Sequence, residues 1–415
     1  MRSAGQRAAS SFAAPLLRDG GDGAPAARDG VASPFDGGPY QRLPAPLGGA
    51  GTDLRTLRRR ALVAIAMTWV PLALLSAMEG LAIRDNPRES LLLDVSAYSR
   101  YLIALPLLIM AEHVALPILT RIVRHFAASG LVSAGDRARF DALVASTRGF
   151  MCSRVAGLVI VGLAYATTLR LAEAVYPVGI SHWSAPIVDG VRTYSLAGWW
   201  RLLVSQPLYL VMIGVWVWRS IGWAMFLYRV TRMDLRLVVA HPDHMGGLQF
   251  VTVSTFAFPL VAFALSMGIA GNIAERVLFD GEPVAAFMQQ ILAALVIVLI
   301  LFLGPLFTLR GPLKRLRTRG IFAYGELASD LGHRFEARWV RPGRNVPGNA
   351  LEAPDFSAVT DAYSIIGNVG AIRLIPIDLK WVSPLVLSAL VPFVPLLLLA
   401  IPLEHLLQFA ANFLL

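Results

Sequence analysis

The sequence predicts an all-α integral membrane protein with about seven transmembrane helices, and two observations lead to this fold class. First, 56% of the 415 residues are hydrophobic and only 15% are charged, whereas soluble domains carry about 25% charged residues. Second, seven apolar runs reach or approach the roughly 20 residues that a helix needs to cross a bilayer. These runs cover about 61–83, 101–119, 155–176, 202–226, 251–274, 286–309 and 381–403.

The distribution of basic residues predicts which side of the membrane each connecting segment faces. Most of the 37 Lys and Arg lie before residue 61 or within 120–154, 227–250 and 310–380. Because positively charged loops stay in the cytoplasm, we expect the N-terminus inside and the C-terminus outside. The net charge of +10 then reflects contact with anionic lipid on the cytoplasmic face, and no nucleic-acid partner is expected.

This topology divides the chain into four regions. Residues 1–54 are rich in Gly, Ala, Pro and Arg and lack an apolar core of signal-peptide length, which predicts a disordered cytoplasmic tail. Residues 55–309 form a six-span membrane region with cytoplasmic loops, and 310–380 form a cytoplasmic amphipathic helical segment. Residues 381–415 form the last span and a short external end.

The cytoplasmic segments 134–150, 313–339 and 355–372 carry apolar residues at helical spacing. Five basic residues lie within the ten from 310 to 319, a pattern typical of a helix on anionic headgroups, with partner docking as the alternative. Besides the lipid bilayer, we expect either further copies of this chain or a soluble cytoplasmic protein as partner. The predicted lipid-contact residues are Arg310, Lys314, Arg315, Arg317 and Arg319.

Polar residues inside the spans are candidate functional residues, because charges are costly in lipid. Toward the predicted inner face, Glu112 and His113 form a pair that either relays protons, binds a cation or holds helices together. Prolines in every span except the third favour broken helices of the kind found in transporters. Toward the predicted outer face lie Glu79, Arg170 and Glu173, together with Asn272, Glu275, Gln289 and Gln290 of later spans.

The segment HPDHMGG at 241–247 offers three side chains that bind metals: His241, Asp243 and His244. Imidazole and carboxylate suit zinc, manganese or iron. The spacing lacks the i, i+4 histidines of a helical metal motif, so a structured turn built on Asp243 and the glycine pair is the alternative. A metal site would need further ligands, for which the cytoplasmic candidates are His125, Asp330 and His333.

Three segments together resemble a family of uncharacterised bacterial multi-span inner-membrane proteins. They are DLRLVVAHPDHMGGL at 234–248, FAYGELA at 322–328 and DFSAVTDAYSIIGNVGAIRLIPID at 355–378. The resemblance extends from about residue 60 to the C-terminus. It implies a location in the bacterial cytoplasmic membrane and implies no activity.

Three classes of function follow from these features. A transporter or channel-like protein is favoured, and its polar pathway would contain Glu79, Glu112, His113, Arg170 and Glu173. The alternative is a membrane-embedded enzyme with a divalent transition metal bound by the HPDH segment on the cytoplasmic side. The third class is a non-catalytic scaffold or signalling partner that docks through 313–339 and 355–372.

Overall fold

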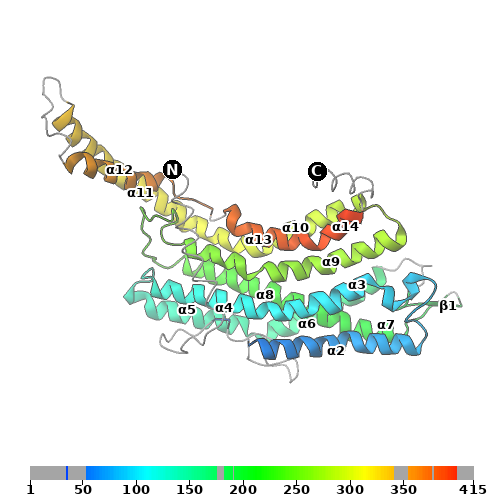
Figure 1. Ribbon diagram of the computed structural model, residues 1–415. Helices are drawn as coiled ribbons and strands as arrows, with labels where there is room; N and C mark the ends of the chain where they lie inside the picture. Colours follow the sequence, from blue (N-terminus) through cyan, green and yellow to red (C-terminus); the bar gives the residue numbers. More distant parts are fainter. Residues whose placement is uncertain are drawn as a thin grey trace, which may run out of the picture. The chain divides into compact units, whose positions relative to one another are not determined.

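The computed structural model describes residues 34–35, 53–174, 182–189, 191–340, 354–375 and 378–399 (Figure 1). This part of the chain is almost entirely helical, with one antiparallel hairpin formed by β1 (Ile187–Val188) and β2 (Val191–Arg192). It contains seven helical segments that are long and apolar enough to cross a membrane. The predicted fold class, an all-α multi-span membrane protein, is therefore confirmed.

The seven candidate spans correspond one by one to the seven apolar runs. The first span is α2 (Leu54–Met78). The second consists of α3 (Val95–Ala97), η3 (Tyr98–Ala104) and α4 (Leu105–Ala128). The third consists of η4 (Ala134–Asp136), α5 (Arg137–Met151) and α6 (Arg154–Ala174). The fourth consists of α7 (Leu196–Trp200), η5 (Arg201–Ser205) and α8 (Gln206–Val230), and the fifth is α9 (Pro259–Asp280). The sixth contains η7 (Val284–Phe287) and α10 (Met288–Leu303). The seventh contains α13 (Leu379–Leu390), η10 (Val391–Phe393) and α14 (Val394–Leu399).

The fifth span begins later than the predicted residue 251, and a proline explains the difference. Residues 249–257 form a 3₁₀ helix, η6 (Gln249–Ala257), and the α-helix starts at Pro259. Proline lacks an N–H and clashes with the carbonyl four residues earlier, so the first turn of an α-helix accepts it more readily than the interior does. The 251–258 stretch therefore enters the bundle before the α-helix begins.

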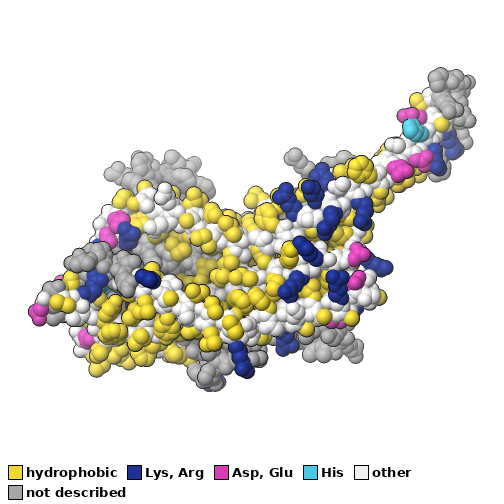
Figure 2. Space-filling view, turned by 180° about the vertical axis from the view of Figure 1, so that it is seen from behind, with side chains coloured by type: hydrophobic (Ala, Val, Ile, Leu, Met, Phe, Trp, Pro, Cys, Tyr) yellow, Lys and Arg dark blue, Asp and Glu magenta, His cyan; other side chains and the backbone are white. Residues whose placement is uncertain are grey.

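The spans pack side by side, with α2 against α4, α4 against α9, α6 against α8, and α9 against α13 (Figure 1). Large aromatic side chains fill the interior, and Phe126 contacts both Phe226 and Phe250 edge-on. Hydrophobic side chains also cover the middle of the outer surface (Figure 2). Exposed residues such as Leu158 of α6 and Ile300 of α10 suit lipid rather than water, because soluble monomers rarely expose large contiguous apolar surfaces.

Two amphipathic helices follow the sixth span: α11 (Arg310–Trp339), reached through η8 (Gly304–Leu309), and α12 (Pro354–Gly370). They pack against each other, and Phe356 of α12 contacts Phe335 and Trp339 of α11. The predicted lipid-contact residues 310, 314, 315 and 319 are exposed and 317 is partly buried, while Leu313 and Leu316 point into the bundle. Figure 2 shows Lys and Arg gathered mainly near the start of α11.

Several predictions fall on residues that the structure does not describe. Most of the predicted tail, residues 1–33 and 36–52, lies outside the described residues, and so does the predicted external end after residue 399. The side chains of Glu173 and Asp355 also lie outside them.

Candidate functional site

The HPDHMGG segment forms a compact loop organised by the carboxylate of Asp243. This carboxylate accepts hydrogen bonds from the backbone N–H groups of Met245 (2.8 Å), Gly247 (3.0 Å) and Gln249 (3.1 Å). It also lies 2.8 Å from Nδ1 of His241. Asp243 thus holds the turn together, as in the alternative interpretation of this segment.

The loop packs against α11 and against the chain after α12. Gly246 has a φ of +66°, which glycine adopts readily, and a Cβ there would stand 2.4 Å from Cδ2 of Leu316. Gly320 of α11 leaves room in the same way for Val239, which precedes the loop, and for Val369 of α12. The N–H of Arg373 donates to the carbonyl of His244 (2.9 Å). Residues 237–246, 316–320 of α11 and 369–373 therefore meet in one place, and they overlap or adjoin the three family-like motifs.

The HPDH side chains do not gather into a metal site within the described part of the chain. His241, Asp243 and His244 do not form a group whose ligand atoms converge. The three additional ligand candidates also have other surroundings. The ring of His125 contacts that of Phe250, with 4.4 Å between centroids. Asp330 pairs with Arg334 at 2.8 Å, and His333 is exposed on α11.

Glu112 lies at the centre of a buried ion cluster that joins three spans. Its carboxylate on α4 is 3.4 Å from the guanidinium of Arg60 on α2 and 3.3 Å from that of Arg219 on α8. All three side chains are at most 5% exposed. His113, the next residue, lies on the exposed side of α4. The structure thus places Glu112 between two arginines of other helices and directs the neighbouring imidazole away from it.

The predicted outer group of Glu79, Arg170 and Glu173 is not brought together among the described side chains. Both carboxylate oxygens of Glu79 accept from the backbone N–H of Leu196, at 2.9 and 3.0 Å. Glu79 thereby caps the N-terminus of α7, where a negative charge is favourable. Arg170 lies on the exposed side of α6.

Another set of polar side chains meets between the second, fourth and fifth spans. Arg100 donates to the side-chain amide oxygens of Asn272 on α9 and of Gln206 on α8, the latter at 3.3 Å. The hydroxyl of Tyr101 donates to the same oxygen of Gln206 at 3.0 Å. No carboxylate of the described residues pairs with Arg100 within 4.0 Å. Neutral oxygens from two other spans therefore surround this guanidinium.

Two π-helical segments present arginines to this region, and a proline accounts for each. Arg100 lies in η3, which precedes Pro106, and Arg201 lies in η5, which precedes Pro207. In a regular α-helix the ring of each proline would clash with the carbonyl four residues earlier. Those carbonyls belong to residues 102 and 203, which lie within the two π-helical segments. The wider π turn moves that carbonyl aside. π-Helical turns of this kind occur frequently at functional sites.

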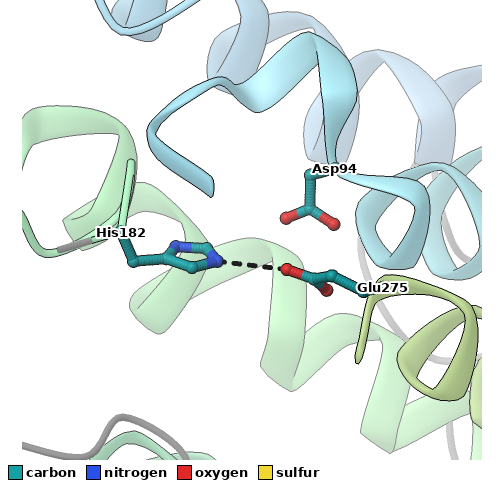
Figure 3. Close-up of side chains that lie close together, drawn as sticks. All are labelled: Asp94, His182 and Glu275. Atoms are coloured by element: carbon teal, nitrogen blue, oxygen red, sulfur yellow. Dashed lines mark hydrogen bonds and ion pairs between the residues drawn. The ribbon is translucent and has the colours of Figure 1, made fainter. Parts of the chain in front are cut away.

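Close to Arg100, the side chains of Asp94, His182 and Glu275 face one another (Figure 3). Their ligand-type atoms all lie within 4.8 Å of one another, a grouping of three that no other His, Cys, Asp or Glu of the described residues forms. Nε2 of His182 is 3.4 Å from Oε1 of Glu275. Asp94 and His182 are buried, while 23% of the Glu275 side chain is exposed. This cluster is therefore open to its surroundings at Glu275.

Local structure fixes Asp94 at the start of the second span. Its Oδ1 accepts from the backbone N–H of Ala97 (2.7 Å), so the residue is the N-cap of α3. Its Oδ2 accepts from the indole N–H of Trp183 (2.8 Å), which is fully buried. The indole thus joins Asp94 to the segment that carries His182.

Close packing against α7 fixes His182. Gly198 of α7 lets this segment approach, because a Cβ there would stand 1.8 Å from the carbonyl oxygen of Ser184. Oγ of Ser184 lies 3.2 Å from Nδ1 of His182 and accepts from the guanidinium of Arg201 at 3.1 Å. The imidazole is therefore oriented through Nδ1, and Nε2 is directed toward Glu275.

Asn272 and Glu275 are recognisable in the sequence as polar residues of the fifth span, but nothing in the sequence connects them with Asp94 or His182. An aspartate directly before an apolar run is a helix-capping signal, and His182 is a histidine in a predicted external loop. The long separations between these residues along the chain hide their proximity, which only the packing of the spans creates.

No protein-family model, no curated protein and no solved structure matches this chain. The resemblance to a family of bacterial inner-membrane proteins therefore stays a prediction.

Proposed function

We propose that this multi-pass membrane protein carries a small anionic solute across the membrane and recognises it through Arg100. The membrane would be the bacterial inner membrane, and the basic segments would hold the N-terminus inside. The observation that supports the proposal is a guanidinium within the helix bundle that is surrounded by amide oxygens of two other spans.

Electrostatics favours an anion as the ligand of this guanidinium. A charged side chain in a membrane span is costly and normally faces a partner or a water-filled cavity. Hydrogen bonds to neutral amides compensate this cost less than those to an ionised acceptor, which are roughly twice as strong. A carboxylate or phosphate matches the planar fork of a guanidinium in two places, so it would replace the amides of Asn272 and Gln206 favourably.

The ion cluster of Glu112 adds support deeper in the same bundle. Glu112 follows Arg100 by twelve residues, which corresponds to roughly 18 Å along a helix. There, the guanidiniums of Arg60 and Arg219 share the carboxylate of Glu112. Two guanidiniums and one carboxylate leave this buried cluster with a net positive charge, which favours an anion over a cation in the bundle.

The test begins with the purified full-length protein in detergent. Acetate, succinate and inorganic phosphate are screened for an increase in melting temperature, and any stabilising anion is then used in uptake measurements with proteoliposomes. We expect Arg100→Gln to abolish both signals and Arg100→Lys to keep part of them. Arg84→Gln is the matched control, since Arg84 is partly exposed in the first predicted external segment and pairs with Glu89 at 3.0 Å.

The proposal fails if none of the three anions stabilises the wild type or enters the proteoliposomes. It also fails if Arg100→Gln transports the anion as the wild type does.

A scaffold role is the second candidate, and the exposed apolar side chains of α11 and α12 favour it. Phe322 and Leu327 on α11 and Ile365 on α12 are at least 47% exposed. If they dock a soluble protein, a stoichiometric partner co-purifies with the wild type and is lost in Phe322→Ser/Leu327→Ser. Unchanged association with liposomes in that variant would argue that the same side chains do not serve lipid contact.

A further inference from the structure

We propose that Asp94, His182 and Glu275 form a binding site for a divalent transition-metal ion. The ligands are one imidazole nitrogen and two carboxylate groups, and they come from the start of the second span, the loop before the fourth span and the fifth span. This site is distinct from the HPDH segment, and it does not depend on the proposed transport of an anion.

The spacing of His182 and Glu275 is compatible with coordination of a single ion, although the ion pairs of Glu112 have similar lengths of 3.3 and 3.4 Å. Charge-assisted N–H···O bonds usually measure about 2.7–2.9 Å, but Nε2 of His182 and Oε1 of Glu275 are 3.4 Å apart. Two ligands at the usual zinc distances of about 2.0–2.2 Å and a tetrahedral angle are separated by about 3.3–3.6 Å. The observed gap therefore matches the separation between two ligands of one ion.

Each ligand is oriented by an outer partner, as in known metal sites. Ser184 holds the imidazole of His182 at Nδ1, which lies 3.2 Å from Oγ of Ser184 and accepts from its backbone N–H at 3.4 Å, so Nε2 is on the side of Glu275. The carboxylate of Asp94 accepts from Ala97 and Trp183. A carboxylate has about four lone-pair sites, so Asp94 retains acceptor capacity for a metal ion.

Charge also favours a cation at this position. Asp94 and Glu275 bring two carboxylates within 4.8 Å of each other in a partly buried place, and such a pair of like charges is unfavourable. Arg100 and Arg201 lie near enough to interact with Glu275 electrostatically, but Arg100 donates its hydrogen bonds to the neutral oxygens of Asn272 and Gln206. A divalent ion between the carboxylates would remove their repulsion directly.

The ligand types narrow the class of metal. Nitrogen and carboxylate oxygen together suit Zn²⁺, Mn²⁺ or Fe²⁺, whereas Mg²⁺ and Ca²⁺ prefer oxygen alone. No thiolate takes part, since the single cysteine, Cys152, lies at the end of α5. Zn²⁺ is therefore the probe for affinity, and Co²⁺ is its spectroscopic substitute.

The experiment measures metal binding to the full-length protein in detergent after treatment with a chelator and its removal. Calorimetric titration with Zn²⁺ is expected to show one ion per chain, and Co²⁺ is expected to give visible absorption bands of a nitrogen–oxygen site. His182→Gln and Glu275→Gln should each weaken Zn²⁺ binding on the order of 100-fold or more, since even outer partners of metal ligands contribute 10–100-fold. His241→Ala/His244→Ala is the matched control and should bind Zn²⁺ as the wild type does.

Three results would overturn the proposal. They are no stoichiometric binding of Zn²⁺ or Co²⁺ by the wild type, unchanged affinity in His182→Gln and Glu275→Gln, or loss of binding only in His241→Ala/His244→Ala. Because the wild type alone decides the first result, poor folding of a variant does not remove the test. Binding is measured without transport, so its failure is distinguishable from failure of the anion proposal.

Discussion

The two charged clusters of the bundle each contain at least one carboxylate but are closed to different degrees. Around Glu112, one carboxylate contacts two arginines, and all three side chains are at most 5% exposed. In the second cluster, His182 and Glu275 are separated by 3.4 Å, and 23% of the Glu275 side chain is exposed. A carboxylate enclosed by opposite charges ties helices together, whereas polar groups that face one another beside an opening are available to a ligand.

The largest effect is expected from breaking the enclosed cluster. Glu112→Gln leaves the guanidiniums of Arg60 and Arg219 buried without their shared carboxylate, and removal of one partner from a buried ion pair costs about 3–5 kcal/mol. We expect a clear decrease in the melting temperature of the detergent-solubilised protein. Glu326→Gln on the exposed side of α11 is the control and should have little effect. An unchanged melting temperature in Glu112→Gln would show that the cluster does not hold the spans together.

The next effect sharpens the difference between the clusters by adding metal. At a Zn²⁺ concentration of 100 times the dissociation constant, binding stabilises the folded protein by about 2.7 kcal/mol. The increase in melting temperature should occur in the wild type and should disappear in Glu275→Gln. A destabilised Glu112→Gln should still respond to Zn²⁺, because distant sites contribute independently. Loss of the response in Glu112→Gln would mean that the two clusters form a single unit.

A smaller effect is expected from the proline that shapes the open region. Pro106→Ala restores a backbone N–H and removes the ring. Without the clash of that ring, the π-helical segment η3 is expected to become regular α-helix. A return to regular α-helix would rotate Arg100 by about 100° relative to α4. The anion-dependent increase in melting temperature should therefore decrease. Pro117→Ala, in an α-helical part of α4, is the control; equal behaviour of the two variants would exclude this role of Pro106.

The smallest effect is expected at an exposed pair that belongs to neither cluster. Asp378 caps α13, and a hydrogen bond from Arg373 holds its pKa below the usual 3.8. A carboxylate with a lowered pKa stabilises the folded state above its unfolded pKa, and this stabilisation is lost as the pH falls through the folded pKa. Asp378→Asn should thus lower the melting temperature slightly at pH 6, and the difference should shrink as the pH falls below 3.8 and vanish below the lower pKa of the folded state. Solvent screening keeps the effect small, and a constant difference at all pH values would contradict it.

Local sequence signals predicted much of the fold because each span and amphipathic helix is recorded in its own residues. The seven apolar runs became seven candidate spans, and the 313–339 pattern became α11. Prolines also carried local information, although Pro106, Pro207 and Pro259 mark changes of helix type rather than simple kinks. The start of the fifth span at Pro259 instead of 251 follows from the same property of proline.

The candidate sites were harder to predict, because sequence proximity is a poor guide to contact between spans. Glu112 and His113 are neighbours in the chain, but adjacent residues on a helix point in different directions, and Glu112 meets two arginines from other helices instead. The HPDH segment places potential ligands close together in sequence, yet Asp243 uses its oxygens for backbone N–H groups.

The sequence by itself determined the fold class, the number of candidate spans and the amphipathic helices, since hydrophobic runs and helical periodicity are local properties that any long enough window records. Only the tertiary structure decided which polar residues meet. Asp94, His182 and Glu275 come from three separate segments, and the amides around Arg100 come from two further positions in other spans. Burial, close approach at glycines and a shared indole bring these groups together, and none of these is encoded within a single stretch of the chain.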